Sequence, residues 1–187
     1  KASESSNFLR IDMESSKNTD STFEIYEELS KSYPKVGVVL QAYLKRSITD
    51  IEKLAGPAFN ARICKGIYKE KEDIAYQNPD EIRKNFLAMA KLMLEKNSYA
   101  SFATHDLQLI NDLVKLTKEM DANSKKFEFQ VLYGVPMKGK LNGLIESGYK
   151  VRVYVPYGAD WYKYSLRRLK ENPNIAGYVI KNLFSKK

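Results

Sequence analysis

Short apolar runs alternate along the whole chain with segments whose apolar residues recur at helical spacing. The apolar runs cover residues 8–13, 36–40, 61–67, 99–104, 127–132 and 151–155. Their nearly unbroken hydrophobic character is typical of strands that are buried on both faces, as in parallel sheets. Between them, apolar side chains three and four residues apart predict amphipathic helices. This alternation predicts an α/β fold made of βαβ units around a parallel sheet.

Each predicted helix begins at residues that favour a helix N-terminus, because their side chains can accept hydrogen bonds from free backbone N–H groups. These start signals are a Ser-x-x-Glu capping box at 21–24, Ser47 and Asp50 before a short helix at 51–55, Asn78 followed by Pro79, Asp106, and Asp160. Helices are also predicted over 141–146 and 175–184. Together the strands and helices leave no linker, and we expect a single domain over residues 1–187.

Polar side chains stand at or near the C-terminal ends of the predicted strands. They are Asp12, Gln41 and Tyr43, Lys65, Thr104 and His105, Gln130, and Tyr154. In a closed (βα)8 barrel these ends converge on one mouth, where the active site lies, whereas an open sheet spreads them along an edge. The alternation alone fits both folds, and the position of the polar residues favours the barrel.

Composition limits the kinds of ligand. The formal net charge of +8 favours anionic partners, but the basic residues are scattered among acidic ones, which argues against a nucleic-acid track. A single cysteine, Cys64, excludes an internal disulfide, and a single histidine, His105, argues against a histidine-based metal site. No apolar run reaches the length that spans a bilayer.

Two groups of arginines are candidates for binding an anion. Arg62 lies inside a predicted strand, so its guanidinium must meet either Asp12 or Glu14 of the neighbouring strand or an electron-rich ligand atom. In the predicted helix after Asp160, four polar side chains share one face: Tyr164, Arg167, Arg168 and Glu171. Two adjacent arginines can bind one carboxylate bidentately. The alternative is a solvated helix face with an ordinary Arg–Glu pair.

Several short motifs, in the same order as in a known family, cover nearly the whole chain. They are Arg-Ile-Asp-Met-Glu at 10–14, Gln-Ala-Tyr-Leu-Lys-Arg at 41–46, Lys-Gly-Ile-Tyr at 65–68 with Arg62 ahead of it, Ala-Thr-His at 103–105, Phe-Glu-Phe-Gln-Val-Leu-Tyr-Gly at 127–134, Val-Arg-Val-Tyr-Val-Pro-Tyr-Gly at 151–158 and Tyr-Ser-Leu-Arg-Arg-Leu-Lys-Glu at 164–171. In these motifs the chain resembles the flavin-dependent proline dehydrogenases, a family built on a (βα)8 barrel. The resemblance implies oxidation of L-proline to 1-pyrroline-5-carboxylate, with hydride transfer to N5 of FAD and electrons passed on to a quinone.

The resemblance also implies roles for individual residues. On the substrate side, Arg167 and Arg168 resemble the pair that holds the proline carboxylate, and Glu171 orients an arginine. The other substrate-side residues are Tyr154, Leu132, Tyr164, Tyr68 and Asp12. Arg62 resembles the arginine beside the flavin N5. The remaining cofactor contacts are expected at Gln41, Lys65, Gly66, Thr104, His105 and Gln130, and no metal is expected.

The chain departs from the family pattern at Ile67, where a small alanine is usual, at Asp106, where asparagine is common, and at Lys163, where proline is usual. Its length is the larger departure, because a (βα)8 barrel usually needs at least about 200 residues. The six predicted strands resemble strands three to eight of the family. We therefore expect an incomplete barrel, whose missing segment comes from another chain or was lost.

Two other interpretations stay open at this point: a non-catalytic barrel fragment that only binds or scaffolds, and a basic nucleic-acid-binding module. The sequence shows no recognised nucleic-acid motif. The resemblance implies no nucleic-acid partner. It implies a cytoplasmic location, with a peripheral contact at the inner face of a bacterial membrane left open, or a mitochondrial one in a eukaryote.

Overall fold

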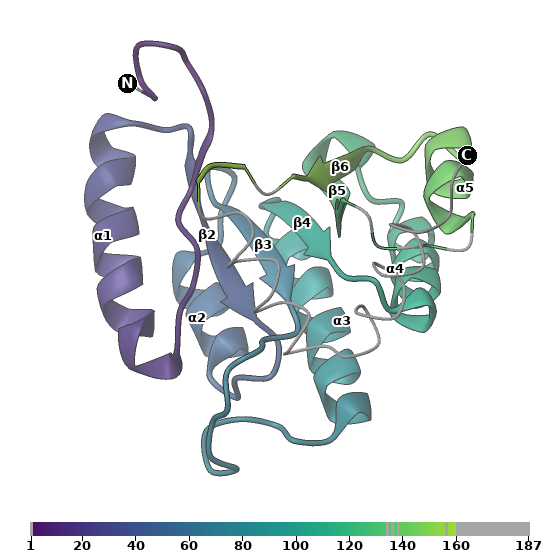
Figure 1. Cartoon of the computed structure of the whole chain (residues 1–187), viewed down its shortest axis with the longest axis horizontal. Helices are drawn as coiled ribbons and strands as arrows, with labels where there is room; N and C mark the ends of the chain where they lie inside the picture. Colours follow the sequence, from purple (N-terminus) through teal and green to yellow (C-terminus); the bar gives the residue numbers. More distant parts are fainter. Residues whose placement is uncertain (1, 134, 136, 138, 156, 160–187) are drawn as a thin grey trace. The chain divides into compact units, whose positions relative to one another are not determined.

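A computed structural model describes residues 2–133, 135, 137, 139–155 and 157–159. The chain divides into two compact units, Lys1–Glu128 and Phe129–Lys187. The elements, labelled in Figure 1 where there is room, are β1 (Leu9–Arg10), η1 (Ser16–Asn18), α1 (Thr19–Ser32), β2 (Val36–Gln41), α2 (Ser47–Leu54), β3 (Asn60–Cys64), α3 (Pro79–Glu95), β4 (Tyr99–Ala103), α4 (Leu107–Glu119), η2 (Ser124–Lys126), β5 (Phe127–Leu132), α5 (Lys140–Glu146) and β6 (Val151–Tyr154). Strand β5 begins in the first unit and continues in the second.

Neighbouring strands are parallel and consecutive in sequence within each unit. In the first unit β1 pairs with β2, β2 with β3 and β3 with β4. In the second, β5 pairs with β6. Helices connect the strands: α1 contacts β2, and α3 contacts β3, β4 and the flanking helices α2 and α4 (Figure 1). The predicted α/β arrangement of parallel strands and helices is therefore confirmed.

The core lies between the strands and the helices that connect them. In the first unit its largest fully buried apolar side chains come from both kinds of element and are Phe86, Phe102, Leu40, Ile51, Ile63, Met89, Met93, Leu109, Ile110 and Leu113. In the second unit Phe129 of β5 is fully buried. These residues include the apolar positions predicted for the helices after Asn78 and Asp106. Because the two methionines of α3 are fully buried there, they act as packing residues.

Gly37 in β2 allows a close crossing by Arg10 of β1. The Arg10 guanidinium donates to the Val38 carbonyl at 2.8 Å and to the Asn60 side-chain oxygen at 2.6 Å. A Cβ at Gly37 would lie 2.4 Å from the Asn60 carbonyl and 2.7 Å from Arg10 Nη1. Only glycine leaves room for this arginine, which ties three neighbouring strands together.

The starts of two helices differ from the prediction. Helix α1 begins at Thr19, so the capping box at 21–24 is wrong. The Ser21 hydroxyl donates to the Asn18 carbonyl at 3.1 Å instead of capping a backbone N–H. Helix α2 begins at Ser47, so Ser47 and Asp50 lie inside it and do not cap it from outside. The Ser47 hydroxyl donates to the Gln41 carbonyl at 2.7 Å.

The other two caps of this unit are confirmed. The Asn78 side chain accepts from the Asp80 N–H at 2.8 Å with Pro79 at the first turn of α3, and Asp106 caps α4. Strand β3 ends at Cys64 instead of residue 67, because Gly66 has a φ of +101° that leaves the extended region. The helices predicted after Asp160 and over 175–184 lie outside the described residues.

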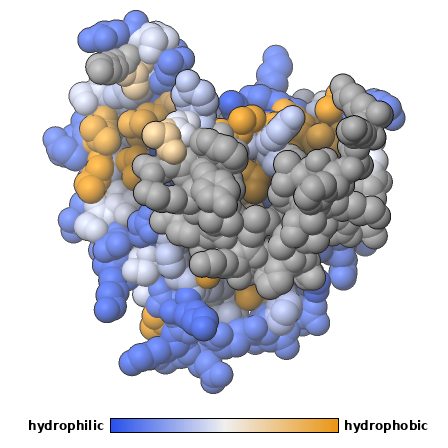
Figure 2. Space-filling view, viewed as in Figure 1, coloured by the Kyte–Doolittle hydropathy of each residue, from blue (hydrophilic) through white to orange (hydrophobic). Residues whose placement is uncertain are grey.

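Apolar side chains are also exposed at β1 and on α1. Phe8 and Leu9 are 45% and 38% exposed, and Ile25 and Leu29 of α1 are 53% and 37% exposed. Figure 2 shows apolar surface in orange where these elements lie, beside hydrophilic side chains in blue. Within the described part of the chain, β1 pairs with β2 alone. No helix there has the length and hydropathy needed to cross a bilayer.

Candidate active site

The carboxyl ends of β1 to β4 carry most of the predicted cofactor residues. Five of them lie at the end of a strand or shortly after it: Gln41 at the end of β2, Lys65 and Gly66 after β3, and Thr104 and His105 after β4. Asp12, predicted on the substrate side, follows β1. Because the strands are parallel and adjacent, these positions lie along one edge of the sheet. The sequence predicted this placement at the strand ends correctly.

Arg62 lies on the same face of the sheet as Gln41. The register pairs Arg62 with Val39 and Gln41 with Cys64, and side chains two residues apart along a strand share a face. Arg62 Nη1 lies 3.0 Å from Asp12 Oδ1. The ion pair with Asp12, one of the alternatives that the sequence left open, is therefore present. Since the Asp12 side chain is 59% exposed, water screens this pair and a ligand can share the guanidinium.

Gln41 presents a buried acceptor at the same edge. Its side chain is 3% exposed, and Oε1 has no hydrogen-bond partner among the residues that the structure describes. A buried carbonyl oxygen without a donor costs about 1–3 kcal/mol. A ligand N–H or O–H that reached this oxygen would recover that energy, so Gln41 fits a cofactor that carries hydrogen-bond donors.

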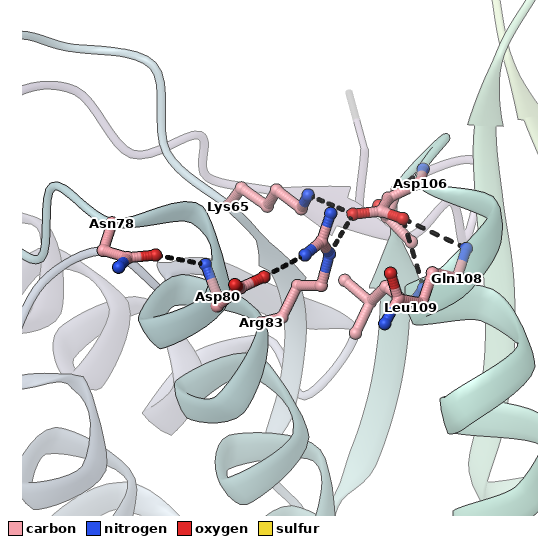
Figure 3. Close-up of polar contacts among 8 residues, drawn as sticks. Lys65, Asn78, Asp80, Arg83, Asp106, Gln108 and Leu109 are labelled. Atoms are coloured by element: carbon pink, nitrogen blue, oxygen red, sulfur yellow. Dashed lines mark hydrogen bonds and ion pairs between the residues drawn. The ribbon is translucent and has the colours of Figure 1, made fainter.

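Asp106 joins Lys65 and Arg83 into an ionic cluster at this edge. Its Oδ2 accepts from Lys65 Nζ at 2.5 Å and from Arg83 Nε at 2.7 Å. Figure 3 shows both cations directed at this carboxylate from different elements. Burial by itself would raise the pKa of the Asp106 carboxyl, but the hydrogen bonds from Lys65 and Arg83 outweigh it and lower the pKa to about 2. Asp106 is therefore ionised at neutral pH.

The segment after β3 is tied to the segments after β1 and β2. The hydroxyl of Tyr68 hydrogen-bonds to the carboxylate of Glu14. Glu70 accepts from the Ser16 backbone N–H at 2.7 Å and from the Ser16 hydroxyl at 2.8 Å. Residues 65–70 thus cross from β3 to the end of β1, and Tyr68, a predicted pocket residue, is held in this crossing segment.

Gly66 and Tyr43 make a second tight contact in this segment. A Cβ at Gly66 would lie 2.3 Å from a Tyr43 ring carbon, so the ring fills the space that a side chain would need. Beyond it, the Tyr76 N–H donates to the Tyr43 carbonyl at 2.7 Å. Burial raises the pKa of the Tyr43 phenol, which stays protonated at neutral pH.

Thr104 and His105 connect β4 to α4. The buried Thr104 hydroxyl accepts from the Asp106 N–H at 3.1 Å and shapes the turn. His105 is partly buried, and burial lowers the pKa of its imidazole below the ordinary value of 6.5. The ring is therefore mainly neutral at pH 7, with one nitrogen that donates and one that accepts.

In the second unit, the predicted residues lie on one face of β5 and β6. Gln130 pairs in register with Arg152, and Leu132 pairs with Tyr154. Gln130 is buried, whereas Tyr154 is 39% exposed. An aliphatic and an aromatic side chain side by side at the strand ends suit an apolar wall. The other predicted substrate residues, Tyr164, Arg167, Arg168 and Glu171, lie outside the described part of the chain.

Sequence reasoning missed the partners of several site residues. It singled out Lys65 as a cofactor contact and Asp106 as a helix cap, but it did not pair the two, and it did not single out Arg83 on α3. A signal was present, because Lys65 and Asp106 have opposite charges and follow strands that pair in the sheet. Glu128 was also missed: it is 1% exposed and accepts from the Tyr99 hydroxyl at 2.9 Å.

Helices that join parallel strands, with polar side chains at the carboxyl ends of those strands, are typical of the α/β enzyme folds, both barrels and open sheets. Residues 1–180 match the family model described as proline dehydrogenase. The chain belongs to the proline dehydrogenase family.

Sequence identity to individual proline dehydrogenases supports this membership. Proline dehydrogenase 1 of Bacillus subtilis subsp. natto is 39% identical over 183 residues, which cover 95% of this chain and 59% of the relative. Proline dehydrogenase of Deinococcus radiodurans is 36% identical over 185 residues, which cover 98% of this chain and 59% of the relative. The chain thus spans about three fifths of the length of these relatives.

A solved structure confirms the type of barrel. Proline utilization A (PutA) of Bdellovibrio bacteriovorus, in a crystal structure of the protein inactivated by N-propargylglycine, superposes with a TM-score of 0.79 at 25% identity. The match covers 95% of this chain and 22% of PutA. The predicted fold, a barrel of the proline dehydrogenase kind, is confirmed, and the described residues contain six of its parallel strands.

Proposed function

We propose that the protein containing this chain is an FAD-dependent proline dehydrogenase that oxidises L-proline to 1-pyrroline-5-carboxylate and passes the electrons to a quinone. The observation that carries the proposal is the family match over residues 1–180. In this proposal residues 1–187 belong to a single catalytic barrel domain, of which they supply all but the N-terminal part. When bound, FAD would supply the chemistry by accepting a hydride from proline at N5.

The described residues fit this cofactor. Arg62 supplies a positive charge on the same face of the sheet as Gln41, whose buried oxygen lacks a donor among the described residues. A fixed positive charge favours electron uptake by a nearby acceptor, since it needs no reorganisation when charge develops. The other residues proposed to hold the cofactor are Lys65, Gly66, Thr104, His105 and Gln130.

The substrate side of the proposal depends on positioning more than on a protein base. Two guanidiniums, Arg167 and Arg168, would bind the proline carboxylate bidentately, and Glu171 would orient one of them. Leu132 and Tyr154, paired in register, would pack on the pyrrolidine ring. The remaining residues proposed to line the pocket are Tyr68, Tyr164 and Asp12. A bacterial protein of this kind would be cytoplasmic or peripheral at the inner membrane face, and a eukaryotic one mitochondrial.

The test is turnover by the complete protein reconstituted with FAD. With L-proline and a soluble quinone analogue, we expect 1-pyrroline-5-carboxylate to form in an amount equal to the quinone reduced. The product is detected as its adduct with an aromatic amine. D-proline is the matched control, because its carboxylate cannot meet the same clamp with the ring in the same place. Flavin bound without product from either enantiomer would contradict the proposal and favour a non-catalytic barrel.

A further inference from the structure

Each of the two oxygens of the Asp106 carboxylate accepts two hydrogen bonds. Oδ1 accepts from the backbone N–H groups of Gln108 at 3.1 Å and Leu109 at 3.2 Å, which caps helix α4. Oδ2 accepts from Lys65 at 2.5 Å and from Arg83 at 2.7 Å. One oxygen therefore caps the helix, and the other accepts from two cations, one in the segment after β3 and one on α3 (Figure 3).

The ionic cluster of Lys65, Arg83, Asp106 and Asp80 has no net charge. Arg83 also pairs with Asp80 at the start of α3, so two cations meet two carboxylates. The Lys65 side chain is 33% exposed and Asp106 only 15%, so the pair lies partly out of solvent, where a charge interaction is stronger than at the surface. In this arrangement the ammonium of Lys65 is already engaged by an anion of the protein itself.

We propose that Asp106 is a positioning residue that restrains Lys65 and competes with an anionic group of the cofactor for its ammonium. The proposal rests on the proposed function, since it takes the phosphates of FAD as the competing anion. Lys65 comes directly after β3, at the edge where Gln41 and Arg62 lie. A phosphate at this edge gains the full charge of Lys65 only if the ammonium leaves Asp106.

An asparagine at this position would separate the two roles of Asp106. Its Oδ1 can still accept from Gln108 and Leu109, because asparagine caps helices as well as aspartate does. Its Nδ2 carries only donors, and it would face the donors of Lys65 and Arg83 without an acceptor between them. Asp106→Asn therefore keeps the helix start and releases Lys65.

The experiment measures binding of FAD and of riboflavin to the complete protein. Riboflavin has the same ring and ribityl chain without phosphate. For Asp106→Asn we expect FAD to bind about five- to twentyfold more tightly and riboflavin to be unchanged, since freeing one charged hydrogen-bond partner is worth that order of magnitude. The added substitution Lys65→Met should abolish the gain.

Asp80→Asn is the matched control. It removes a carboxylate from the same cluster, one that contacts Arg83 and not Lys65, so FAD affinity should change less than about twofold, as for an exposed ion pair. A second measurement needs no cofactor: acylation of lysines followed by mass spectrometry. Lys65 should react several-fold faster in Asp106→Asn, with the exposed Lys84 as internal reference.

Unchanged or weaker FAD binding in Asp106→Asn, or an equal gain for riboflavin, overturns the competition between Asp106 and the phosphates. A gain that survives Lys65→Met overturns the role of Lys65. Wild-type protein that binds neither flavin contradicts the proposed function, and the inference about Asp106 falls with it. Faster acylation of Lys65 together with the FAD-specific gain supports the inference.

Discussion

Replacing Arg62 by methionine is expected to lower kcat/KM for L-proline by about 10²- to 10³-fold, the usual cost of removing a fixed charge from the reacting centre. Methionine keeps most of the length of the stem and removes the charge that pairs with Asp12. The reduction potential of the bound flavin should also fall, because electron uptake loses a positive neighbour. Steady-state kinetics and a potentiometric titration of the complete protein measure both effects.

Lys115→Met is the matched control for this loss of charge. Lys115 is 75% exposed on α4 and pairs only loosely with Glu119, at 3.6 Å, so its removal should leave kcat/KM and the potential unchanged. A methionine at Arg62 that lowers activity no more than this control would show that Arg62 serves only the ion pair with Asp12.

Replacing Gly66 by alanine is expected to destabilise the protein by about 2–6 kcal/mol, since backbone strain and overpacking each cost about 1–3 kcal/mol. The φ of +101° is rarely adopted by residues with a side chain, and the new Cβ would lie 2.3 Å from the Tyr43 ring. Tyr43 is 6% exposed, so the ring cannot swing into solvent without opening the packing around it.

Gly56→Ala provides the comparison for Gly66→Ala. A Cβ there meets nothing within 4 Å and its φ is ordinary, so the free energy of unfolding should change by less than about 0.5 kcal/mol. Chemical denaturation of the two variants gives both values. If the two substitutions had equal effects, the contact between Gly66 and Tyr43 would not constrain the segment after β3.

Local sequence patterns were enough to predict an element where one residue preference dominates, such as an unbroken apolar run or a clear helix cap. The run 127–132 is β5 with the predicted bounds, and Asn78 with Pro79 starts α3. The predicted start of α1 was wrong because four residues of one turn can compete for the free backbone groups there: Asn18, Thr19, Ser21 and Thr22. The Thr22 hydroxyl donates to the Asn18 carbonyl at 2.7 Å. Residues of similar capping preference in one turn leave the choice to packing.

Long-range partners were harder to predict than positions. The sequence placed Lys65 and His105 at strand ends, and it offered Asp12 as one partner of Arg62. It took the two strands as neighbours, whereas β2 lies between β1 and β3 in the sheet. It did not join Lys65 to Asp106 and Arg83, since that contact depends on how α3 and α4 pack beside the sheet. The crossing of Arg10 over Gly37 likewise depends on strand register, which local periodicity does not determine.

The most direct test of the proposed function is anaerobic mixing of the FAD-bound complete protein with L-proline. We expect the visible absorbance of oxidised flavin to disappear at a rate that saturates with proline concentration. We also expect 1-pyrroline-5-carboxylate to form in an amount equal to the flavin bleached. Absorbance that stays unchanged with excess L-proline, while FAD remains bound, would contradict hydride transfer from proline and with it the proposed dehydrogenase activity.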